Sequence, residues 1–181
     1  MANALAVSKP FDLKQHIRTL PDFPIPGVLF YDITPLLANG EAWTEAVEQF
    51  DRMTARYPVD FIAGIDARGF LFAGALAARR GVGVILVRKK GKLPGDTLDH
   101  AYDLEYGKGT LEAQIGMFPA GARILIVDDL LATGGTLAAS VALLTKLRGH
   151  VVCAATFIEL IGLGGRDRLD VPCETLLQYQ V

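Results

Sequence analysis

The chain has 181 residues, of which 51% are hydrophobic and 21% charged, a balance typical of a folded globular protein and not of a disordered one. This length predicts one domain over residues 1–181, with enough apolar side chains for a hydrophobic core. The formal net charge of -2 at pH 7 argues against a protein that binds nucleic acid or a membrane surface through a basic face.

The first third of the chain predicts two helices separated by a loop. Residues 11–20 carry apolar side chains at helical spacing, which favours a short amphipathic helix. Prolines and a glycine then predict a loop over 21–27. A longer helix is expected over 41–56, with Asn39 as its N-cap.

From residue 59 onward, short apolar runs alternate with helical patterns. Buried strands are predicted over 59–65, 83–87, 123–127 and 151–160, helices over 70–80 and 136–148, a hairpin of 101–106 with 110–115, and an edge strand over 175–179. This alternation predicts a three-layer α/β fold, with a mostly parallel central sheet flanked by helices and a hairpin inserted between the second and third buried strands. In such sheets, ligands bind at the C-terminal ends of the strands.

Two acids and a glycine–threonine loop follow the third buried strand. Asp128 and Asp129 come directly after Val127, and their carboxylates are suited to accept hydrogen bonds from the two hydroxyls of a ribose ring. The loop that follows consists of Ala132, Thr133, Gly134, Gly135 and Thr136. Glycine amides, threonine hydroxyls and the start of the next helix together favour a phosphate. The segment therefore predicts binding of a ribose 5-phosphate.

Other interpretations explain less of this segment. A plain turn capped by Thr136 accounts for that residue, but for neither the paired acids nor the double glycine. A Walker A loop requires a lysine after its last glycine, whereas Thr136 follows Gly135. A dinucleotide-binding site requires Gly-x-Gly-x-x-Gly after a first strand, and the sequence has no such run there.

Five segments together resemble the type I phosphoribosyltransferase family. They are 26–35, 66–70, 88–95, 104–107 and 126–136, and the likeness extends from about residue 17 to 179. The wording Val-Asp-Asp-Leu-Leu-Ala-Thr-Gly-Gly-Thr is most similar to that of adenine phosphoribosyltransferases. The resemblance implies a single phosphoribosyltransferase domain that converts adenine and 5-phosphoribosyl-1-pyrophosphate (PRPP) to AMP and pyrophosphate in purine salvage.

Basic side chains after the first two buried strands form a candidate pyrophosphate site. The planar guanidinium of Arg68 suits phosphate oxygens, although a surface ion pair would also account for it. Arg88, Lys89 and Lys92 would otherwise be a solvated charge run. The resemblance assigns the loop of Arg68 to the pyrophosphate of PRPP and implies a cis peptide bond at 66–67, and Arg68 is expected to be catalytic as well. Arg88, Lys89 and Lys92 follow the second buried strand, so they are expected to face the same crevice and to bind the pyrophosphate too. Contacts that strengthen as charge builds on the leaving group lower the barrier.

Residues 93–107 form a candidate lid. The segment is polar, contains Pro94 and Gly95, and lies between a strand and the hairpin, so it is suited to close over the activated sugar and exclude water. From spacing alone, Glu105 is equally consistent with an exposed hairpin residue. The resemblance assigns Glu105 the role of general acid or base near N7 of adenine, with Tyr106 beside it.

The base is expected to bind at an N-terminal segment of about residues 20–37. The resemblance places Phe30 against adenine, Leu160 on the opposite face, and the backbone of Leu29 and Tyr31 at the edge of the base. Ordinary core packing is the alternative for Phe30. Tyr31 replaces the arginine or lysine common in relatives, which affects base specificity only if this side chain contacts the base.

The remaining expectations concern the cofactor, assembly and compartment. Magnesium is expected to be held mainly through PRPP, with no direct protein ligand assigned, and relatives of this length imply a homodimer. Cys153 and Cys173 form no Cys-x-x-Cys pair, which favours two reduced thiols. The N-terminus has no signal-peptide pattern and no stretch is long enough to span a membrane, so a cytoplasmic protein is expected.

Two further hypotheses differ in substrate or in kind. The same reaction on hypoxanthine, guanine or xanthine fits the fold, but the adenine-type wording of 128–136 argues against it. A regulator that binds PRPP without turnover would need a DNA-binding module. The chain has neither the spare length nor a basic helix-turn-helix segment for one, and such a regulator would not need Glu105.

Overall fold

The computed structural model describes residues 11–103 and 108–181. The chain divides into two compact units, of which the first ends at Gln49 and the second begins at Phe50. No helix in the described part of the chain is long and apolar enough to cross a membrane.

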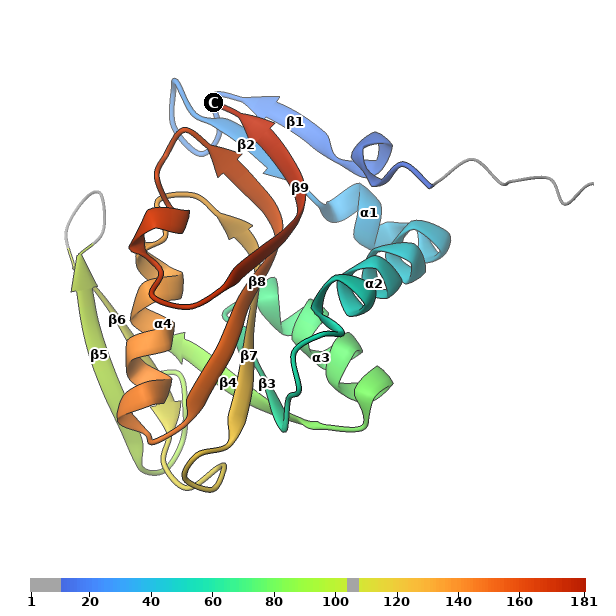
Figure 1. Ribbon diagram of the computed structural model, residues 1–181. Coiled ribbons are helices and arrows are strands. Elements are labelled where there is room, and N and C mark those ends of the chain that lie inside the picture. Colours follow the sequence, from blue (N-terminus) through green and yellow to red (C-terminus); the bar gives the residue numbers. More distant parts are fainter. Residues whose placement is uncertain (1–10, 104–107) are drawn as a thin grey trace, which may run out of the picture. The chain divides into compact units, whose positions relative to one another are not determined.

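The first unit contains a two-stranded antiparallel sheet (Figure 1). A 3-10 turn, Leu13–His16, precedes β1 (Arg18–Pro21), which pairs with β2 (Leu29–Asp32). The short helix α1 (Thr34–Ala38) follows, and α2 (Gly40–Thr54) begins two residues later. The predicted N-cap is confirmed, because Asn39 Oδ1 accepts a hydrogen bond from the Ala42 N–H at 3.0 Å.

The helix predicted over 11–20 is wrong. Asp12 accepts a hydrogen bond from the Lys14 N–H at 3.0 Å and caps a single 3-10 turn, and by Ile17 the backbone is already extended. The residue before Pro21 is also biased away from helical backbone. Pairing with β2, which is distant in the sequence, therefore overrides the local apolar spacing.

The second unit is built on a seven-stranded sheet in the order β5-β6-β4-β3-β7-β8-β9. The strands are β3 (Phe61–Ile65), β4 (Gly83–Lys89), β5 (Thr97–Asp103), β6 (Lys108–Gln114), β7 (Arg123–Leu131), β8 (His150–Ile161) and β9 (Cys173–Gln180). β4, β3, β7, β8 and β9 run parallel, and the β5–β6 hairpin joins β4 in the antiparallel sense.

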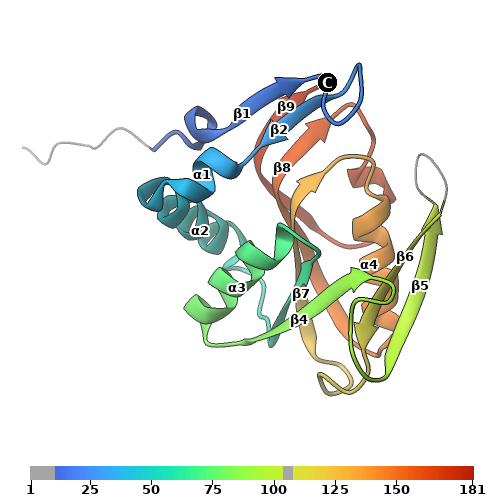
Figure 2. The same ribbon diagram turned by 180° about the vertical axis from the view of Figure 1, so that it is seen from behind.

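Helices cover both faces of this sheet. α3 (Gly69–Arg80) lies on one face and α4 (Gly135–Lys146) on the other (Figures 1 and 2). The predicted α/β class, the mostly parallel sheet between helices, the inserted hairpin and the edge position of the last strand are all confirmed.

Apolar side chains fill the space on each side of the sheet. Beneath α4, buried aliphatic residues such as Ile126 and Leu143 form one cluster. Beneath α3, the Phe72 ring lies 5.6 Å from the Phe50 ring and 5.2 Å from the Phe157 ring, measured between centroids. Burial of such aromatic and aliphatic surface is the main favourable term in folding, and it fixes both helices against the sheet.

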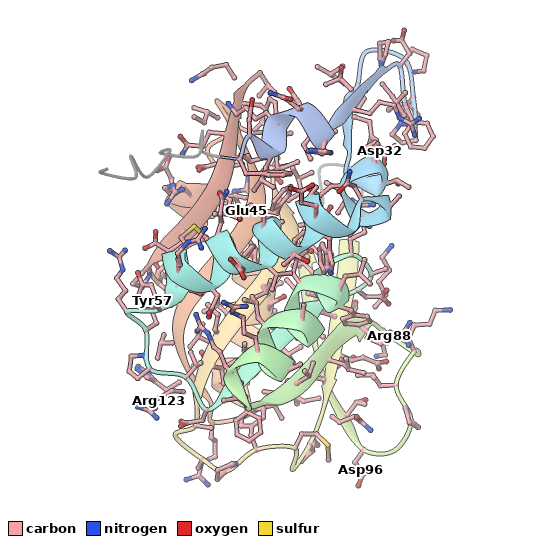
Figure 3. All side chains as sticks on the ribbon, turned by 90° about the vertical axis from the view of Figure 1, so that its right-hand side faces the viewer. Asp32, Glu45, Tyr57, Arg88, Asp96 and Arg123 are labelled. Atoms are coloured by element: carbon pink, nitrogen blue, oxygen red, sulfur yellow. The ribbon has the colours of Figure 1, made fainter. Side chains whose placement is uncertain are left out.

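The parallel strands bring their C-terminal ends to one edge of the sheet. Arg88 lies near the C-terminal end of β4, whereas Arg123 begins β7, and the two side chains lie at opposite ends of the sheet (Figure 3). Loops that follow β3, β4 and β7 therefore meet at the edge marked by Arg88.

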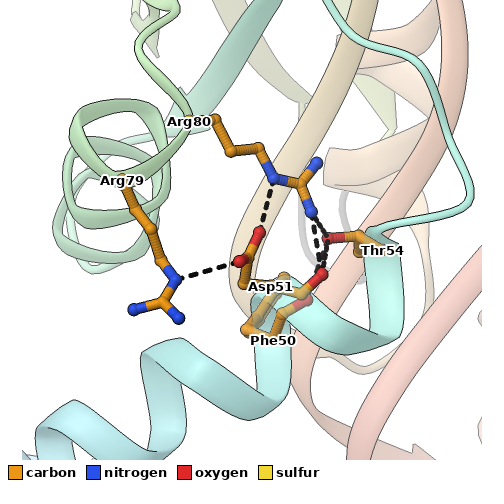
Figure 4. Close-up of polar contacts among 5 residues, drawn as sticks. All are labelled: Phe50, Asp51, Thr54, Arg79 and Arg80. Atoms are coloured by element: carbon orange, nitrogen blue, oxygen red, sulfur yellow. Dashed lines mark hydrogen bonds and ion pairs between the residues drawn. The ribbon is translucent and has the colours of Figure 1, made fainter.

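A charged cluster fastens the end of α3 to the last turn of α2 (Figure 4). Arg80 donates to Asp51 Oδ1 at 2.6 Å, to the Asp51 carbonyl oxygen at 2.9 Å and to Thr54 Oγ1 at 2.7 Å. Arg79 donates to Asp51 Oδ2 at 2.9 Å. The side chain of Arg80 is 14% exposed and that of Arg79 is 45% exposed, so the two arginines share an acid but differ in burial.

This difference predicts unequal effects on stability. Arg80→Met should lower the free energy of unfolding by about 2 kcal/mol, because Asp51 Oδ1, the Asp51 carbonyl oxygen and the buried Thr54 Oγ1 lose the donors that Arg80 supplies. Arg79→Met should cost less than about 1 kcal/mol, as exposed ion pairs do. Urea denaturation of both variants measures the two values, and equal losses would contradict the assignment of Arg80 as the anchoring residue.

Candidate active site

A cavity of about 430 Å³ opens at the C-terminal ends of β3 and β7. It is lined by Ile65, Asp66, Ala67, Arg68, Lys89, Tyr102, Leu111 and the continuous run 128–137. All of these residues belong to the second unit. The structure thus brings together the predicted acid pair, the glycine–threonine loop, Arg68 and Lys89 around one space.

The loop that joins β7 to the start of α4, residues 132–136 (the phosphate loop), has the features predicted for a phosphate site. Gly134 has a φ of +80°, a backbone conformation that residues with a Cβ adopt at a cost, and α4 begins at the next residue. A Cβ on Gly134 would lie within 3.0 Å of the Gly165 carbonyl oxygen. The loop is therefore held in close backbone contact, with the N-terminus of a twelve-residue helix directed at the cavity.

The acid pair lies inside β7, not after it as predicted. β7 continues to Leu131, and Asp128 is paired with Thr156 and Leu130 with Ile158 of β8. The sequence pattern ended the strand at Val127 because charged residues are uncommon in a buried strand. Here β7 pairs with β8 on both sides of Asp129, and both acids line the cavity from within the strand.

The two carboxylates have different partners. Asp129, 8% exposed, accepts an ion-paired hydrogen bond from Arg68 Nε at 2.5 Å. Asp128 Oδ1 accepts the Asp129 N–H at 2.9 Å. Burial, and then the charge of Asp129, raise the pKa of Asp128 well above its usual range. The ionised form of Asp128 is thus costly in the absence of a ligand that donates hydrogen bonds to it.

The turn before α3 holds Arg68 close to this pair. The peptide bond between Asp66 and Ala67 is cis, as expected. A Cβ on Gly69 would lie 2.7 Å from the Val127 carbonyl oxygen and 2.9 Å from Asp128 Oδ1. Only a glycine fits between the start of α3 and β7, and this close approach places Arg68 beside Asp129.

The basic residues after β4 divide into two groups. Lys89 lines the cavity, whereas Arg88 and Lys92 do not. Instead, Arg88 donates to Asp66 Oδ2 at 2.9 Å and to the Lys92 carbonyl oxygen at 3.0 Å. Arg88 thus links the turn that carries Arg68 to the turn that carries Lys92.

A buried carboxylate organises the same basic turn. Glu112 of β6 is 3% exposed, and its Oε1 accepts the Lys92 and Leu93 N–H groups, each at 2.7 Å. Burial raises the pKa of Glu112, but hydrogen bonds from the N–H groups of Gly91, Leu93 and Lys92 outweigh it and hold the pKa below the usual value. The hairpin and the basic turn are therefore tied together by one ionised side chain.

The predicted lid overlaps a regular strand. Residues 97–103 form β5, which pairs with β6 through its whole length, so the described part of the lid outside a strand is 93–96. The predicted hairpin strand began at Ala101, so the sequence pattern missed residues 97–100, whose composition is polar. Glu105 and Tyr106 lie outside the described residues, and Tyr102 brings the hairpin into the lining of the cavity.

Comparison with known proteins identifies the family. A family model of the phosphoribosyl transferase domain matches residues 33–175. An adenine phosphoribosyltransferase of Gluconacetobacter diazotrophicus is 54% identical over 168 residues, which cover 93% of this chain and 96% of that protein. The chain belongs to the phosphoribosyltransferase family, among the adenine phosphoribosyltransferases.

Solved structures of the same family share the fold. The crystal structure of adenine phosphoribosyltransferase from Thermoanaerobacter pseudethanolicus superposes with a TM-score of 0.90 at 44% identity, covering 92% of this chain and 98% of that one. The Saccharomyces cerevisiae enzyme, solved with an imino-altritol bisphosphate and adenine, gives a TM-score of 0.86 at 37% identity, covering 91% and 96%.

The residues predicted to bind the base lie in both units. In β2, Leu29 is 45% exposed, Phe30 is half-buried with its ring 5.0 Å from that of Phe23, and Tyr31 is buried. Leu160 is half-buried near the end of β8. The burial of Tyr31 is consistent with a side chain that packs in the protein, and the base-binding roles of all four residues stay predictions for this phosphoribosyltransferase.

Three residues near the cavity were not predicted. Tyr102 faces Gly109 in the hairpin register, so its position follows once the hairpin turn is located. Glu112 alternates with apolar neighbours and resembles a solvent-facing residue in the sequence. Gly165 approaches the phosphate loop from a distant segment, and only its glycine neighbours hint at a close contact.

Metal-binding groups are sparse in the described part of the chain. It holds no group of three or more His, Cys, Asp or Glu side chains that could bind a metal ion. The carboxylates of the cavity are Asp66, Asp128 and Asp129, and arginines already pair with the first and the last of them. This donor set suits a hydrated magnesium ion that takes most of its ligands from the substrate.

Proposed function

We propose that this chain transfers the phosphoribosyl group of PRPP to adenine, releasing pyrophosphate and forming AMP. The observation that carries the proposal is the convergence of Asp128, Asp129, the 132–136 loop, Arg68 and Lys89 on one cavity, in a chain about half identical to adenine phosphoribosyltransferases. The structure of the yeast relative with adenine bound supports adenine as the base.

Different residues of the cavity bind the three parts of PRPP. The 5-phosphate binds the amides and hydroxyls of the 132–136 loop at the start of α4, and the ribose hydroxyls donate hydrogen bonds to Asp128 and Asp129. The pyrophosphate extends toward Arg68 and Lys89, with Lys92 held nearby by the Arg88 and Glu112 contacts.

Charge development explains the distribution of basic residues. As the bond to the anomeric carbon breaks, positive charge grows on the ribose and negative charge on the pyrophosphate. Arg68 and Lys89 stabilise the leaving group, and the carboxylates of Asp128 and Asp129 stabilise the ribose. Magnesium held mainly through PRPP would neutralise charge on the pyrophosphate, and Asp128 and Asp129 are the cavity carboxylates that would help to hold it.

The base and the proton complete the proposed reaction. Phe30 and Leu160 enclose the adenine, while the backbone of Leu29 and Tyr31 reads its edge. Glu105, with Tyr106 beside it, acts as the general acid or base at N7 of adenine. The β5–β6 hairpin excludes water from the activated sugar. These roles follow from the family resemblance of 26–35, 104–107 and Leu160.

Turnover with a panel of bases tests the proposal. Purified protein with PRPP and magnesium should release pyrophosphate with adenine, and at least about 100-fold more slowly with hypoxanthine, guanine or xanthine, as hydrogen-bond readout of an exocyclic amine allows. Glu105→Gln should lower kcat by at least about 100-fold, while PRPP still binds. A preference for 6-oxopurines, or full activity of Glu105→Gln, would refute the corresponding part.

Assembly and compartment are proposed on separate grounds. A homodimer is supported by apolar side chains that remain exposed on the second unit, among them Leu71 of α3 and Val84 and Leu86 of β4. A cytoplasmic location is supported by Cys153 and Cys173, which are both free thiols.

A further inference from the structure

The Gly162–Gly165 segment forms a backbone wall behind the phosphate loop. Residues 162–164 and 166–168 are exposed, but Gly165 between them is buried. A Cβ on Gly165 would lie within 3.0 Å of the Ala132 carbonyl oxygen, and a Cβ on Gly134 within 3.0 Å of the Gly165 carbonyl oxygen. The two backbones are in mutual contact, so a shift of Gly165 displaces the loop.

The residue after this wall is anchored by a network of hydrogen bonds. Arg166 begins the 3-10 turn Arg166–Arg168 and donates to Glu159 through Nη2 at 2.6 Å and Nε at 3.1 Å, a planar two-bond geometry. It also donates to Thr175 Oγ1 at 3.2 Å and to the Cys173 carbonyl oxygen. One guanidinium thus ties the wall to β8 and β9.

The acceptor in this network is itself fixed. The side chain of Glu159 is 9% exposed, and its Oε2 also accepts a hydrogen bond from Gln178 Nε2 at 2.9 Å. Hydrogen bonds from Arg166 and Gln178 lower the pKa of Glu159, with burial opposing them, so the carboxylate stays ionised. Glycine-rich backbone loses much conformational entropy when it orders, and the fixed ion pair at its end offsets this cost.

We propose that Glu159 and Arg166 are positioning residues for the 5-phosphate of PRPP, acting through the contact of Gly165 with the 132–136 loop. Neither side chain lines the cavity, so neither touches the substrate there. The inference rests on the proposed function, because it assigns the loop to the 5-phosphate. It predicts that loss of the ion pair weakens PRPP binding more than adenine binding, since misplaced loop amides meet the phosphate poorly.

Substitution of Arg166 tests this role. Arg166→Met keeps a long, unbranched side chain but removes the paired hydrogen-bond donors. It should raise KM for PRPP about 10-fold, while KM for adenine stays within about twofold. Arg166→Lys keeps the charge without the planar geometry and should raise KM for PRPP about threefold. Arg168→Met, in the same exposed turn, is the matched control and should behave as the wild type.

The outcomes separate this inference from the proposed function. Wild-type protein that neither binds PRPP nor forms AMP would refute the function itself. Wild-type activity with an unchanged KM for PRPP in Arg166→Met would overturn only the positioning role, even if the melting temperature fell, because a purely structural ion pair predicts that result. Equal increases in both KM values would also overturn it. If Arg166→Met does not fold, the KM values of Arg166→Lys decide.

Discussion

Gly134→Ala should lower kcat/KM for PRPP by at least about 100-fold, because the new methyl group would displace the 132–136 loop, and catalysis tolerates only small displacements of the groups that hold the substrate. The collision is between the Cβ and the backbone carbonyl of Gly165, so no side-chain rotation relieves it. Gly134 must also keep a φ of +80°, which costs a residue with a Cβ about 1–2 kcal/mol. Steady-state kinetics with both substrates, together with thermal unfolding, measure the two effects.

Gly121→Ala separates backbone strain from the collision. Gly121 has a φ of +79°, but a Cβ there would have no atom within 4 Å. This variant should lose only the stability that the positive φ costs, about 1 kcal/mol, and keep its kcat/KM. If the two alanine variants had the same kcat/KM, close packing of the loop against Gly165 would not be important for catalysis.

The sequence predicted the elements that local pattern determines. The apolar runs around Ile65, Val87 and Ile126 and the alanine-rich helix that becomes α3 follow from hydrophobicity and periodicity alone. The hairpin followed from a glycine-containing turn between two extended segments. In these cases the local preference and the tertiary environment agree, which is why the order of layers could be inferred.

Elements that depend on distant partners were missed. β1 forms because 18–21 pair with 29–32, and no pattern within 11–20 contains that information. β7 extends through Asp128 and Asp129 because β8 supplies its hydrogen bonds. Both errors occurred where long-range pairing outweighs residue preference.

The residues expected to contact the substrate were predictable from the sequence, whereas the residues that hold the surrounding loops in place were not. Residues that would meet the substrate, such as Arg68 and Asp129, have types and spacings that reflect the ligand, and they lie together. Glu112 and Gly165 contact the backbone of residues that are distant in the sequence, so their residue types do not indicate a ligand. Arg88 has the expected charge, but it donates hydrogen bonds to protein acceptors. Neither Arg88 nor Lys92 is part of the cavity lining.

Asp128→Asn should raise the thermal stability of the substrate-free protein while lowering kcat/KM for PRPP by about 100-fold, as loss of a charge that acts in the transition state does. Burial and the neighbouring Asp129 make the ionised Asp128 side chain unfavourable in the folded protein. The amide oxygen of asparagine can still accept the Asp129 N–H that Asp128 Oδ1 accepts at 2.9 Å. The substitution thus removes a destabilising charge and keeps the hydrogen bond.

The dependence on pH has a defined sign. Because the pKa of Asp128 is raised in the folded state, the folded protein binds more protons than the unfolded chain between the usual pKa of 3.8 and the raised value. Stability therefore falls as pH rises through that window, and the penalty is complete above it. The stabilising effect of Asp128→Asn should be absent near pH 3 and largest above the raised pKa.

Asp60→Asn provides a control of opposite sign. Hydrogen bonds from the Arg123 side chain and N–H lower the pKa of Asp60 to about 2, so its ionised form stabilises the folded protein above pH 3.8, and this contribution is lost as pH falls toward 2. At pH 7, Asp60→Asn should lower the melting temperature and Asp128→Asn should raise it, with about 2–4 °C for each kcal/mol at this chain length. A melting temperature of Asp128→Asn below that of the wild type at pH 7 would contradict the view that this carboxylate is kept for the substrate at the expense of stability.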